Sequence, residues 1–405
     1  MKPIQFNPFV PEFRINPYPI YHRLRAENDI CSTLGGAWFL TRYEHVKTIL
    51  KERRVYSYER PKLISEKNKD LQNKGKNIDA LVDTSNKFLF YINPPDHTRL
   101  RRLVSKALLP VVIEGMRPQI QTIVDECLEV VQIRGEMDII ADLAEVLPAN
   151  VIARMLGVSP GDAPKRLQQN SQILSRILDS LISLEEYEAI NKGILEFQEY
   201  FRVLIAQRSK APQDDLISYL IAARDKNDKL SEEEVLAICI QLFVAAEETT
   251  VNLIGNGMLA LLQHPEQMEK LKQNPQIIRI AVEEMLRYDS PIQTISRIAG
   301  DTLEIGRQTV QKGEKIFLCL GAANRDPSQF YQPDQFDISR AENQHLAFGD
   351  GTHRCLGASL ARIQAEIAID SLLQKLPNLK LASDKLEWRK NLALRGLKAL
   401  PVTFS

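Results

Sequence analysis

Near its C-terminal end the chain reads Phe348-Gly349-Asp350-Gly351-Thr352-His353-Arg354-Cys355-Leu356-Gly357. One cysteine stands in a glycine-rich loop, two positions after a histidine, and a helical pattern begins directly after it. Backbone N–H groups in such a loop and the positive end of the following helix both favour a thiolate over a thiol. A stabilised thiolate can be a nucleophile or a metal ligand. The alternative is a purely structural cysteine in a turn. The loop by itself does not distinguish these roles, so the other motifs of the chain are needed.

This loop resembles the haem-binding loop of the cytochromes P-450, F-G-x-G-x-H-x-C-x-G, with all six specified positions filled. The resemblance extends over essentially the whole chain and implies haem b as cofactor. It implies that Cys355 binds the haem iron through its thiolate, which favours cleavage of the O–O bond of bound oxygen. Phe348 would cover this ligand, while Gly349 and Gly357 would let the backbone approach the sulfur and the porphyrin.

The composition is that of an ordinary soluble globular protein. Of 405 residues, 44% are hydrophobic and 26% charged, and 52 basic residues balance 52 acidic ones. This balance argues against a general attraction to nucleic acid or membranes. No linker or repeat marks a boundary, so we expect one domain, residues 1–405, with β-rich parts near 35–60, 294–320 and 386–405. The five cysteines include no C-x-x-C pair, which argues against a disulfide framework and a structural zinc site.

The N-terminal residues and the apolar runs indicate where in the cell the protein is expected. The N-terminal residues lack the charged-then-apolar pattern of a signal peptide. The longest apolar run, Val235–Ala246, is too short to span a bilayer. We therefore expect a cytoplasmic protein without a membrane anchor, unlike membrane-anchored members of the resembled family.

Helical periodicity dominates the chain. Ser231-Glu232-Glu233-Glu234 is a capping box that begins a helix running to His264, where Pro265 ends it. Such a helix is about 50 Å long, and because it is apolar nearly all round it should be buried. The other predicted helices cover residues 18–27, 43–51, 97–108, 111–133, 141–156, 184–209, 214–224, 265–273, 277–288 and 356–375.

The β signals are short. Gly35-Gly36 leads into a predicted strand over 37–41, and residues 296–320 indicate several strands. Residues 388–404 are expected to return to the same sheet. The predicted class is therefore mainly α with small β sheets, which the resemblance identifies as the cytochrome P-450 fold with the long central helix over the haem.

The long helix contains an unusual polar stretch, Ala245-Ala246-Glu247-Glu248-Thr249-Thr250. Burying a carboxylate without partners is costly, so structure alone would rarely place one in a buried helix. The alternative to a functional role is that these charged residues lie on a solvated face of the helix. The stretch resembles the family's A-G-x-E-T-T oxygen-binding groove, in which Ala245 would border the haem. By that resemblance Glu248 relays protons and Thr249 donates a hydrogen bond to oxygen held at the iron. Ala246 stands where the family usually has glycine, and its extra methyl group is expected to narrow the groove.

Two further sets of residues follow from the resemblance. Glu284 and Arg287 lie one helical turn apart and can pair; they match the family's E-x-x-R, which locks onto an arginine of the loop ahead of the cysteine, here Arg340. These three are expected to be structural. Haem propionates need cationic or bidentate partners, and the resemblance assigns this role to His97, Arg101, Arg297 and His353.

The implied function is a monooxygenase that inserts one oxygen atom from O2 into a hydrophobic small molecule by hydroxylation or epoxidation. Its electrons would come from a ferredoxin or flavodoxin-type donor with its reductase, docked on a basic patch of Arg102, Lys106 and Arg354. Natural-product or polyketide tailoring is the favoured role, with fatty-acid or steroid/terpenoid hydroxylation as the alternative. Lysines within residues 59–91 suggest a mobile, basic entrance for a carboxylate or for a substrate tethered to a carrier protein. A peroxide-driven enzyme or a non-catalytic haem sensor remains the alternative class.

Overall fold

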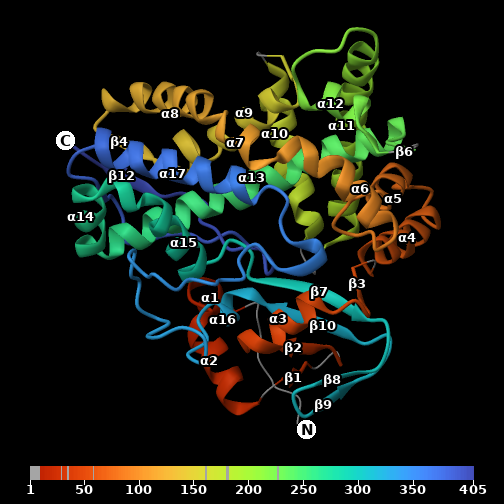
Figure 1. Cartoon of the computed structure of the whole chain (residues 1–405), viewed down its shortest axis with the longest axis horizontal. Coiled ribbons are helices and arrows are strands. Elements are labelled where there is room, and N and C mark those ends of the chain that lie inside the picture. Colours follow the sequence, from red (N-terminus) through yellow and green to blue (C-terminus); the bar gives the residue numbers. More distant parts are fainter. Residues whose placement is uncertain are drawn as a thin grey trace. The chain divides into compact units, whose positions relative to one another are not determined.

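The computed structural model describes residues 10–28, 30–33, 36–57, 59–159, 162–178, 182–225 and 228–405. Gly35, where the first β-rich part is predicted to begin, lies outside these residues. The contacts within the chain define two compact units. Unit 1 comprises Met1–Tyr56, Gln121–Ala144 and Thr249–Ser405, and unit 2 comprises Ser57–Ile120 and Glu145–Glu248. Helices make up most of the regular secondary structure of both units (Figure 1).

Unit 1 contains a mixed five-stranded sheet. Its strands in spatial order are β1 (Cys31–Ser32), β2 (Trp38–Leu40), β10 (Lys315–Cys319), β7 (Thr294–Ala299) and β3 (Val55–Tyr56). β10 runs parallel to β2 and antiparallel to β7, and the register places Ile316 opposite Arg297. Val46 and Ile49, on the apolar face of α3 (Tyr43–Lys51), pack with Ile316 and Leu318 in one buried cluster. The sheet therefore holds Arg297 on a strand that is fixed from both edges.

The last strand does not return to that sheet, so this prediction is wrong. β12 (Pro401–Thr403) pairs with β4 (Glu136–Asp138) and β11 (Lys380–Leu381) in a separate three-stranded sheet. Alternation along a strand indicates which face is buried but does not select a partner far away in sequence. A single bridge between Ile292 and Leu394 connects the preceding loop to the segment ahead of β7. A hairpin of β8 (Leu303–Ile305) and β9 (Gln308–Val310) completes the strands of unit 1.

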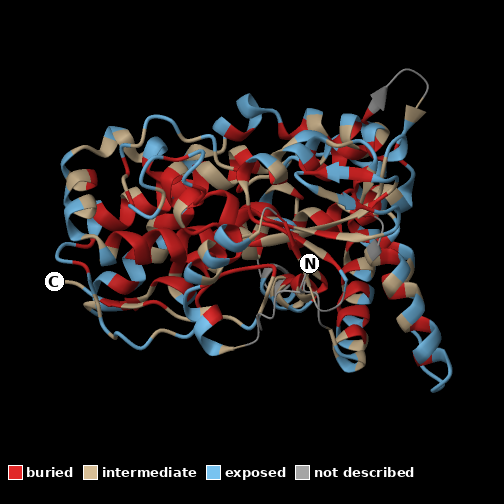
Figure 2. Cartoon of the chain, turned by 90° about the horizontal axis from the view of Figure 1, so that it is seen from below, coloured by how far each residue is buried: buried red, intermediate tan, exposed pale blue. Residues whose placement is uncertain are grey.

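Most helices of unit 1 agree with the sequence pattern. Among the described residues, the helices wholly within unit 1 are α1 (Pro11–Ile15), α2 (Tyr18–Glu27), α3, α14 (Pro265–Gln273), α15 (Ile278–Tyr288), α16 (Leu320–Ala323) and α17 (Ala358–Lys375), with short turns at Ile140–Ala144, Pro275–Ile277 and Gly351–His353. The short α1 and α16 are absent from the predictions. Several helices are buried on one side and exposed on the other (Figure 2), whereas α17 is buried nearly all round.

Two helices belong to both units, α8 (Arg117–Gln132) and α13 (Glu232–Gln263). The capping box of α13 is confirmed: Glu234 N donates to Ser231 Oγ at 3.2 Å, and Ser231 N donates to Glu234 Oε2 at 2.8 Å. α13 is long and apolar enough to cross a membrane by length and composition alone, but 72% of that apolar window is buried inside the protein. This burial is what a core helix shows.

The regular structure of the described residues of unit 2 is helical apart from the antiparallel pair β5 (Arg224–Asp225) and β6 (Asp228–Lys229). Its helices are α4 (Glu59–Gln72), α5 (Asp79–Ser85), α6 (Asp96–Ser105), α7 (Pro110–Glu114), α9 (Val146–Met155), α10 (Asp162–Leu174), α11 (Leu184–Lys210) and α12 (Leu216–Ala222), with short turns at Lys106–Leu108 and Ser175–Leu178. The helix predicted over 111–133 is divided, because α7 ends at Gly115 and Pro118 occupies the first turn of α8.

The segment expected to be a mobile entrance holds two helices, α4 and α5. Ile64 and Leu71, on the inner face of α4, are completely or almost completely buried. Asn68, between them, accepts a hydrogen bond from Ile78 N at 2.8 Å and donates to Asp79 at 2.7 Å. Helix α4 is absent from the sequence-based predictions, because only two apolar residues mark its inner face and the helical periodicity is weak.

Candidate active site

The cysteine loop of unit 1 is a closed turn ahead of α17. Cys355 N donates to Phe348 O at 2.8 Å, and Gly349 N donates to Leu346 O at 2.8 Å. These bonds bring Phe348 and Cys355 together at the ends of the predicted motif. Cys355 is exposed, whereas Cys31, Cys239 and Cys319 are buried. Among the four cysteines named here, the one in the motif is thus the one whose thiol is open to a ligand.

The glycines of this loop fall into two kinds. Gly351 has a left-handed φ of +67°, and a side chain there would press against the carbonyl oxygen of Leu50 at 2.5 Å. Gly357 has an ordinary φ of −87°, and no described atom lies within 4 Å of where its Cβ would be. Gly349 also faces open space, at a φ of +66°. The backbone beside Cys355 therefore leaves room for a flat bound group, and this open cradle fits a porphyrin.

A cluster absent from the sequence predictions holds the loop in place. Glu283 accepts two hydrogen bonds from Arg362, at 2.5 and 2.8 Å, and contacts His345 at 3.0 Å. The Arg362 guanidinium lies over the ring of Phe348, 4.4 Å from its centroid. Burial opposes ionisation of Glu283, but the hydrogen bonds from Arg362 and His345 lower its pKa to about 2. No local sequence pattern signals this pair, because its members are 79 residues apart.

Arg362 also responds to the cysteine. Burial lowers its pKa, but the ion pair with Glu283, with a further contribution from the Cys355 side chain, raises the pKa above its ordinary value. Arg362 therefore stays a cation close enough to Cys355 to favour the anionic form of the sulfur. This positive charge therefore supports a thiolate at Cys355.

The structure brings Glu284, Arg287 and Arg340 together. Arg287 donates to both carboxylate oxygens of Glu284, at 2.7 and 2.8 Å, and Arg340 Nε donates to the same carboxylate at 3.1 Å. Arg287 also donates to the carbonyls of Asn324, Pro333 and Gln335. The bonds from Arg287 to these carbonyls and from Arg340 to Glu284 tie α15 to residues 324–340, ahead of the cysteine loop. The arrangement is that of a structural lock.

Arg297 is a cation with no acidic partner among the described residues. Its Nη1 donates to the neighbouring Ser296 carbonyl at 2.8 Å, and burial alone lowers its pKa to about 10. The guanidinium is still protonated at neutral pH, so an anion beside it would relieve the cost of burying this charge. A haem propionate supplies such an anion. His353, in the turn before Cys355, is half-buried.

The polar stretch of α13 contains both buried and accessible side chains. Glu247 is 1% exposed, whereas Glu248 and Thr249 are half-buried and Ala245 is exposed. The exposed Ala245 directly follows two buried apolar residues, Phe243 and Val244, and marks a place where the described residues leave the helix uncovered. One turn after Thr249, Asn252 is buried with neither amide atom hydrogen-bonded to a described residue.

His97 and Arg101 lie on α6 of unit 2, four residues apart. His97 is 1% exposed, and burial, together with the nearby Arg101 charge, lowers its pKa to about 4. The imidazole is therefore neutral at pH 7 and can donate a hydrogen bond without adding a second buried charge. Arg101 is half-buried and Arg102 exposed.

Comparisons with known proteins agree with this fold and loop. The model of the cytochrome P450 family matches residues 37–387. The biotin biosynthesis cytochrome P450 of Bacillus subtilis (strain 168) is 42% identical over 396 residues, which are 97% of each chain. The polyketide biosynthesis cytochrome P450 PksS of the same organism is 38% identical over the full length of both chains. The structure of P450BioI in complex with hexadec-9Z-enoic acid ligated acyl carrier protein matches with a TM-score of 0.90 and 41% identity, covering 97% of this chain and all of that one.

The fold is thus the mainly helical haem-thiolate fold expected from the sequence. The chain belongs to the cytochrome P450 family. It is a monooxygenase with haem b as its cofactor and O2 as its co-substrate, and it needs a redox partner. Bound haem supplies the iron at which oxygen is activated.

Proposed function

We propose that the protein oxidises a hydrophobic acyl chain, by hydroxylation or epoxidation, while that chain is carried by an acidic carrier protein, as a tailoring step of natural-product biosynthesis. The observation that carries the proposal is the likeness to P450BioI bound to an acylated carrier protein. The polyketide relative supports the same kind of substrate. Free fatty acids, steroids and terpenoids are the alternatives, since CYP109E1, 30% identical, was solved with corticosterone and with testosterone.

A basic segment of unit 2 supports the carrier. Residues 67–76 hold four lysines and a single acidic residue. Lys69 and Lys74 are exposed at the end of α4 and just after it. Lys67 pairs with Asp70 at 3.1 Å, and Lys76 pairs with Glu188 of α11 at 2.9 Å. Lys69 stands on a helix with a buried inner face and Lys74 follows that helix directly, so these two lysines present a positive surface to an acidic partner.

The roles of individual residues form part of the same proposal. Cys355 binds the iron, and Arg297 and His353 bind the propionates. The family resemblance gives His97 and Arg101 the same role. Thr249 holds a proton at its hydroxyl for donation to oxygen, and Glu248 restores that proton. We also propose a ferredoxin or flavodoxin-type protein as the electron donor.

The haem assignment is tested by absorption. We expect the reduced protein with carbon monoxide to show the strongly red-shifted Soret band of an anionic sulfur ligand, and Cys355→Ser to abolish it. A band at the position typical of a nitrogen ligand in the wild type would contradict the role of Cys355. Cys239→Ser is the control, because Cys239 is buried in α13 and does not belong to the cysteine loop.

The carrier is tested by the spin-state shift that a substrate causes. Hexadecanoyl carrier protein should bind about tenfold more tightly than free hexadecanoic acid, and added salt should remove the difference. Lys69→Glu with Lys74→Glu should remove the difference too, leaving the affinity for the free acid unchanged. Lys312→Glu, an exposed lysine in a turn of unit 1, is the matched control. Equal affinities for both ligands in the wild type would leave free fatty acids as the better substrates.

A further inference from the structure

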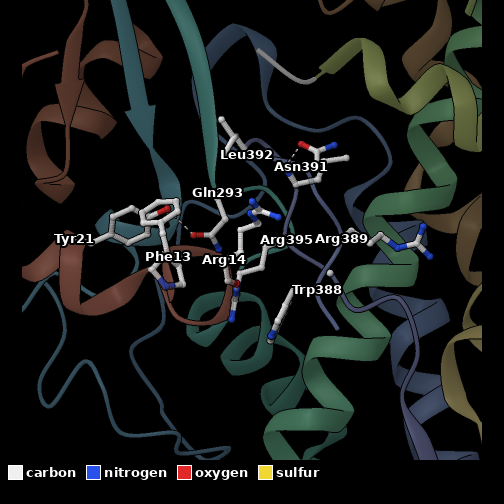
Figure 3. A pocket seen from close by; sticks show the side chains of 12 residues that line it. Phe13, Arg14, Tyr21, Gln293, Trp388, Arg389, Asn391, Leu392 and Arg395 are labelled. Carbon is white, nitrogen blue, oxygen red and sulfur yellow. Dashed lines mark hydrogen bonds between the residues drawn. The ribbon is translucent and has the colours of Figure 1, made fainter. Parts of the chain in front are cut away.

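The loop 391–397 of unit 1 is held by one buried arginine. Arg395, 9% exposed, donates from Nε to Asp289 at 2.7 Å, just after the end of α15. Its Nη1 and Nη2 donate to the carbonyls of Arg14 and Ile15, at 2.6 and 2.9 Å, at the end of α1. The guanidinium also stacks 3.5 Å from the ring centroid of Trp388. Figure 3 shows Arg395, Arg14 and Trp388 around one pocket.

The backbone of the loop is fixed against α13 as well. Asn256 Nδ2 donates to the carbonyl of Arg395 at 3.0 Å and to that of Asp289 at 3.3 Å. Gly396 lies so close to Asn252 that any side chain at position 396 would collide with the Asn252 amide. The loop thus lies along the face of α13 that carries Asn252 and Asn256.

That face is also the face of Thr249. Residues three and seven positions apart lie on one side of a helix, so Thr249, Asn252 and Asn256 form one polar stripe. Asn252 is one turn from Thr249, and the loop packs against Asn252. Any displacement of the loop therefore changes the space next to the hydroxyl that the proposed function places at the oxygen.

We propose that Arg395 is a positioning residue that fixes loop 391–397 against the Thr249 face of α13 and so sets which atom of the substrate is oxidised. The selectivity half of this inference rests on the proposed function. The Arg395 side chain joins α1, the residue after α15 and Trp388, and its backbone carbonyl accepts a hydrogen bond from Asn256 of α13. Its four side-chain contacts use the whole guanidinium, which a lysine ammonium cannot reproduce. The Tyr18 hydroxyl donates to the same Asp289 oxygen at 2.8 Å and holds the carboxylate in place.

The matched variants are Arg395→Lys and Arg325→Lys. Arg325 is also a buried arginine of unit 1: it lies between the rings of Tyr18 and Tyr288, 3.6 and 3.8 Å from their centroids, and donates to Tyr288 O at 2.8 Å. Its hydrogen bonds and ring contacts do not reach loop 391–397. Both variants remove a stacked guanidinium, so a general loss of stability affects both.

The first measurement is amide hydrogen exchange, which needs no substrate. Arg395→Lys should speed exchange in residues 391–397 and 12–16 by about tenfold or more, since local opening becomes easier there. Arg325→Lys should leave residues 391–397 unchanged. Equal exchange in the loop for wild type and Arg395→Lys would overturn the proposal, whatever the true substrate is.

The second measurement is the distribution of oxidised positions on hexadecanoic acid, or on testosterone if the wild type does not oxidise the acid. Arg395→Lys should change the ratio of products, or the product formed per NADPH consumed, by about tenfold at unchanged haem content. Arg325→Lys should change neither. The same product pattern in Arg395→Lys as in wild type, or the same change in both variants, would refute the role in selectivity. Failure of the wild type to oxidise either probe would count against the proposed substrates. The exchange result would still show whether Arg395 fixes loop 391–397.

Discussion

Glu284 and Arg287 form a completely buried ion pair across one helical turn, with two hydrogen bonds of 2.7 and 2.8 Å. Further donors complete the shell of the carboxylate: Arg340, Asn343 and the backbone N–H of Asp337, at 3.0 to 3.2 Å. A carboxylate with this many donors recovers much of what it loses on leaving water. The pair fixes the chain that leads into the cysteine loop.

Removing one partner of this pair should be severe. Glu284→Gln keeps the shape but leaves Arg287 as a buried, poorly compensated charge, at a cost of about 3–5 kcal/mol. We expect low haem content and a clearly lower thermal unfolding temperature. Lys270→Ala, which breaks the exposed contact with Asp337, is the control and should cost at most about 1 kcal/mol. Full haem loading and wild-type stability of Glu284→Gln would contradict the structural role.

The cluster around Glu283 predicts a pH dependence. The pKa of Glu283 lies at about 2 in the folded protein, below its ordinary value of 4.5. A lowered pKa contributes stability at neutral pH, and this contribution is lost as the pH falls from about 5 towards 2. The contribution is about 3 kcal/mol at most. Denaturant unfolding of wild type and Glu283→Gln should therefore differ most at pH 7 and converge below pH 3. A constant difference over that range would mean that the carboxylate charge is not the source.

The hydroxyl of Thr249 is expected to matter for coupling and not for folding. Thr249→Ala should bind haem normally but form about tenfold less product per NADPH, with the missing electrons appearing as hydrogen peroxide. Peroxide and product are measured in the same reaction. Thr250→Ala is the neighbouring control, because Thr250 lies on a different side of α13 and is buried. Tightly coupled turnover in Thr249→Ala would disprove the assigned role.

The cap of α13 can be tested on its own. Ser231→Ala removes the acceptor for the Glu234 N–H and should lower the free energy of unfolding by about 1 kcal/mol. The absorption spectrum with carbon monoxide should stay unchanged, because only the first turn is affected. Ser209→Ala, an exposed serine in the last turn of α11, should change stability by less than about 0.5 kcal/mol. An equal effect of both variants would argue that the capping bonds add nothing.

The parts that sequence alone predicted are those that act locally. The cysteine loop, the Glu284–Arg287 pair and the Ser231 cap each lie within a few residues, where spacing and chemistry can be read directly. The helices with wide apolar faces were equally clear. α4 was missed because Asn68 takes a place on its inner face that an apolar residue would have marked.

What the sequence could not predict are contacts between distant segments. Glu283 meets Arg362, and Asp289 meets Arg395, across 79 and 106 residues. Charged residues are common on helices and loops, so no pattern distinguishes these four from solvated ones. The partner of β12 was mistaken for the same reason, since only the folded chain brings Val402 beside Met137.

Gly351 and Gly357 separate two demands that one short loop has to meet. A methyl group at 351 intrudes on the protein's own backbone, whereas at 357 it meets no described atom and would be felt only by a guest molecule. Glycine at 351 is therefore required for the chain to fold. Glycine at 357 is required only when the prosthetic group binds. Substitutions at position 357 therefore change the surroundings of the bound group while sparing the fold, whereas substitutions at position 351 disturb the fold itself.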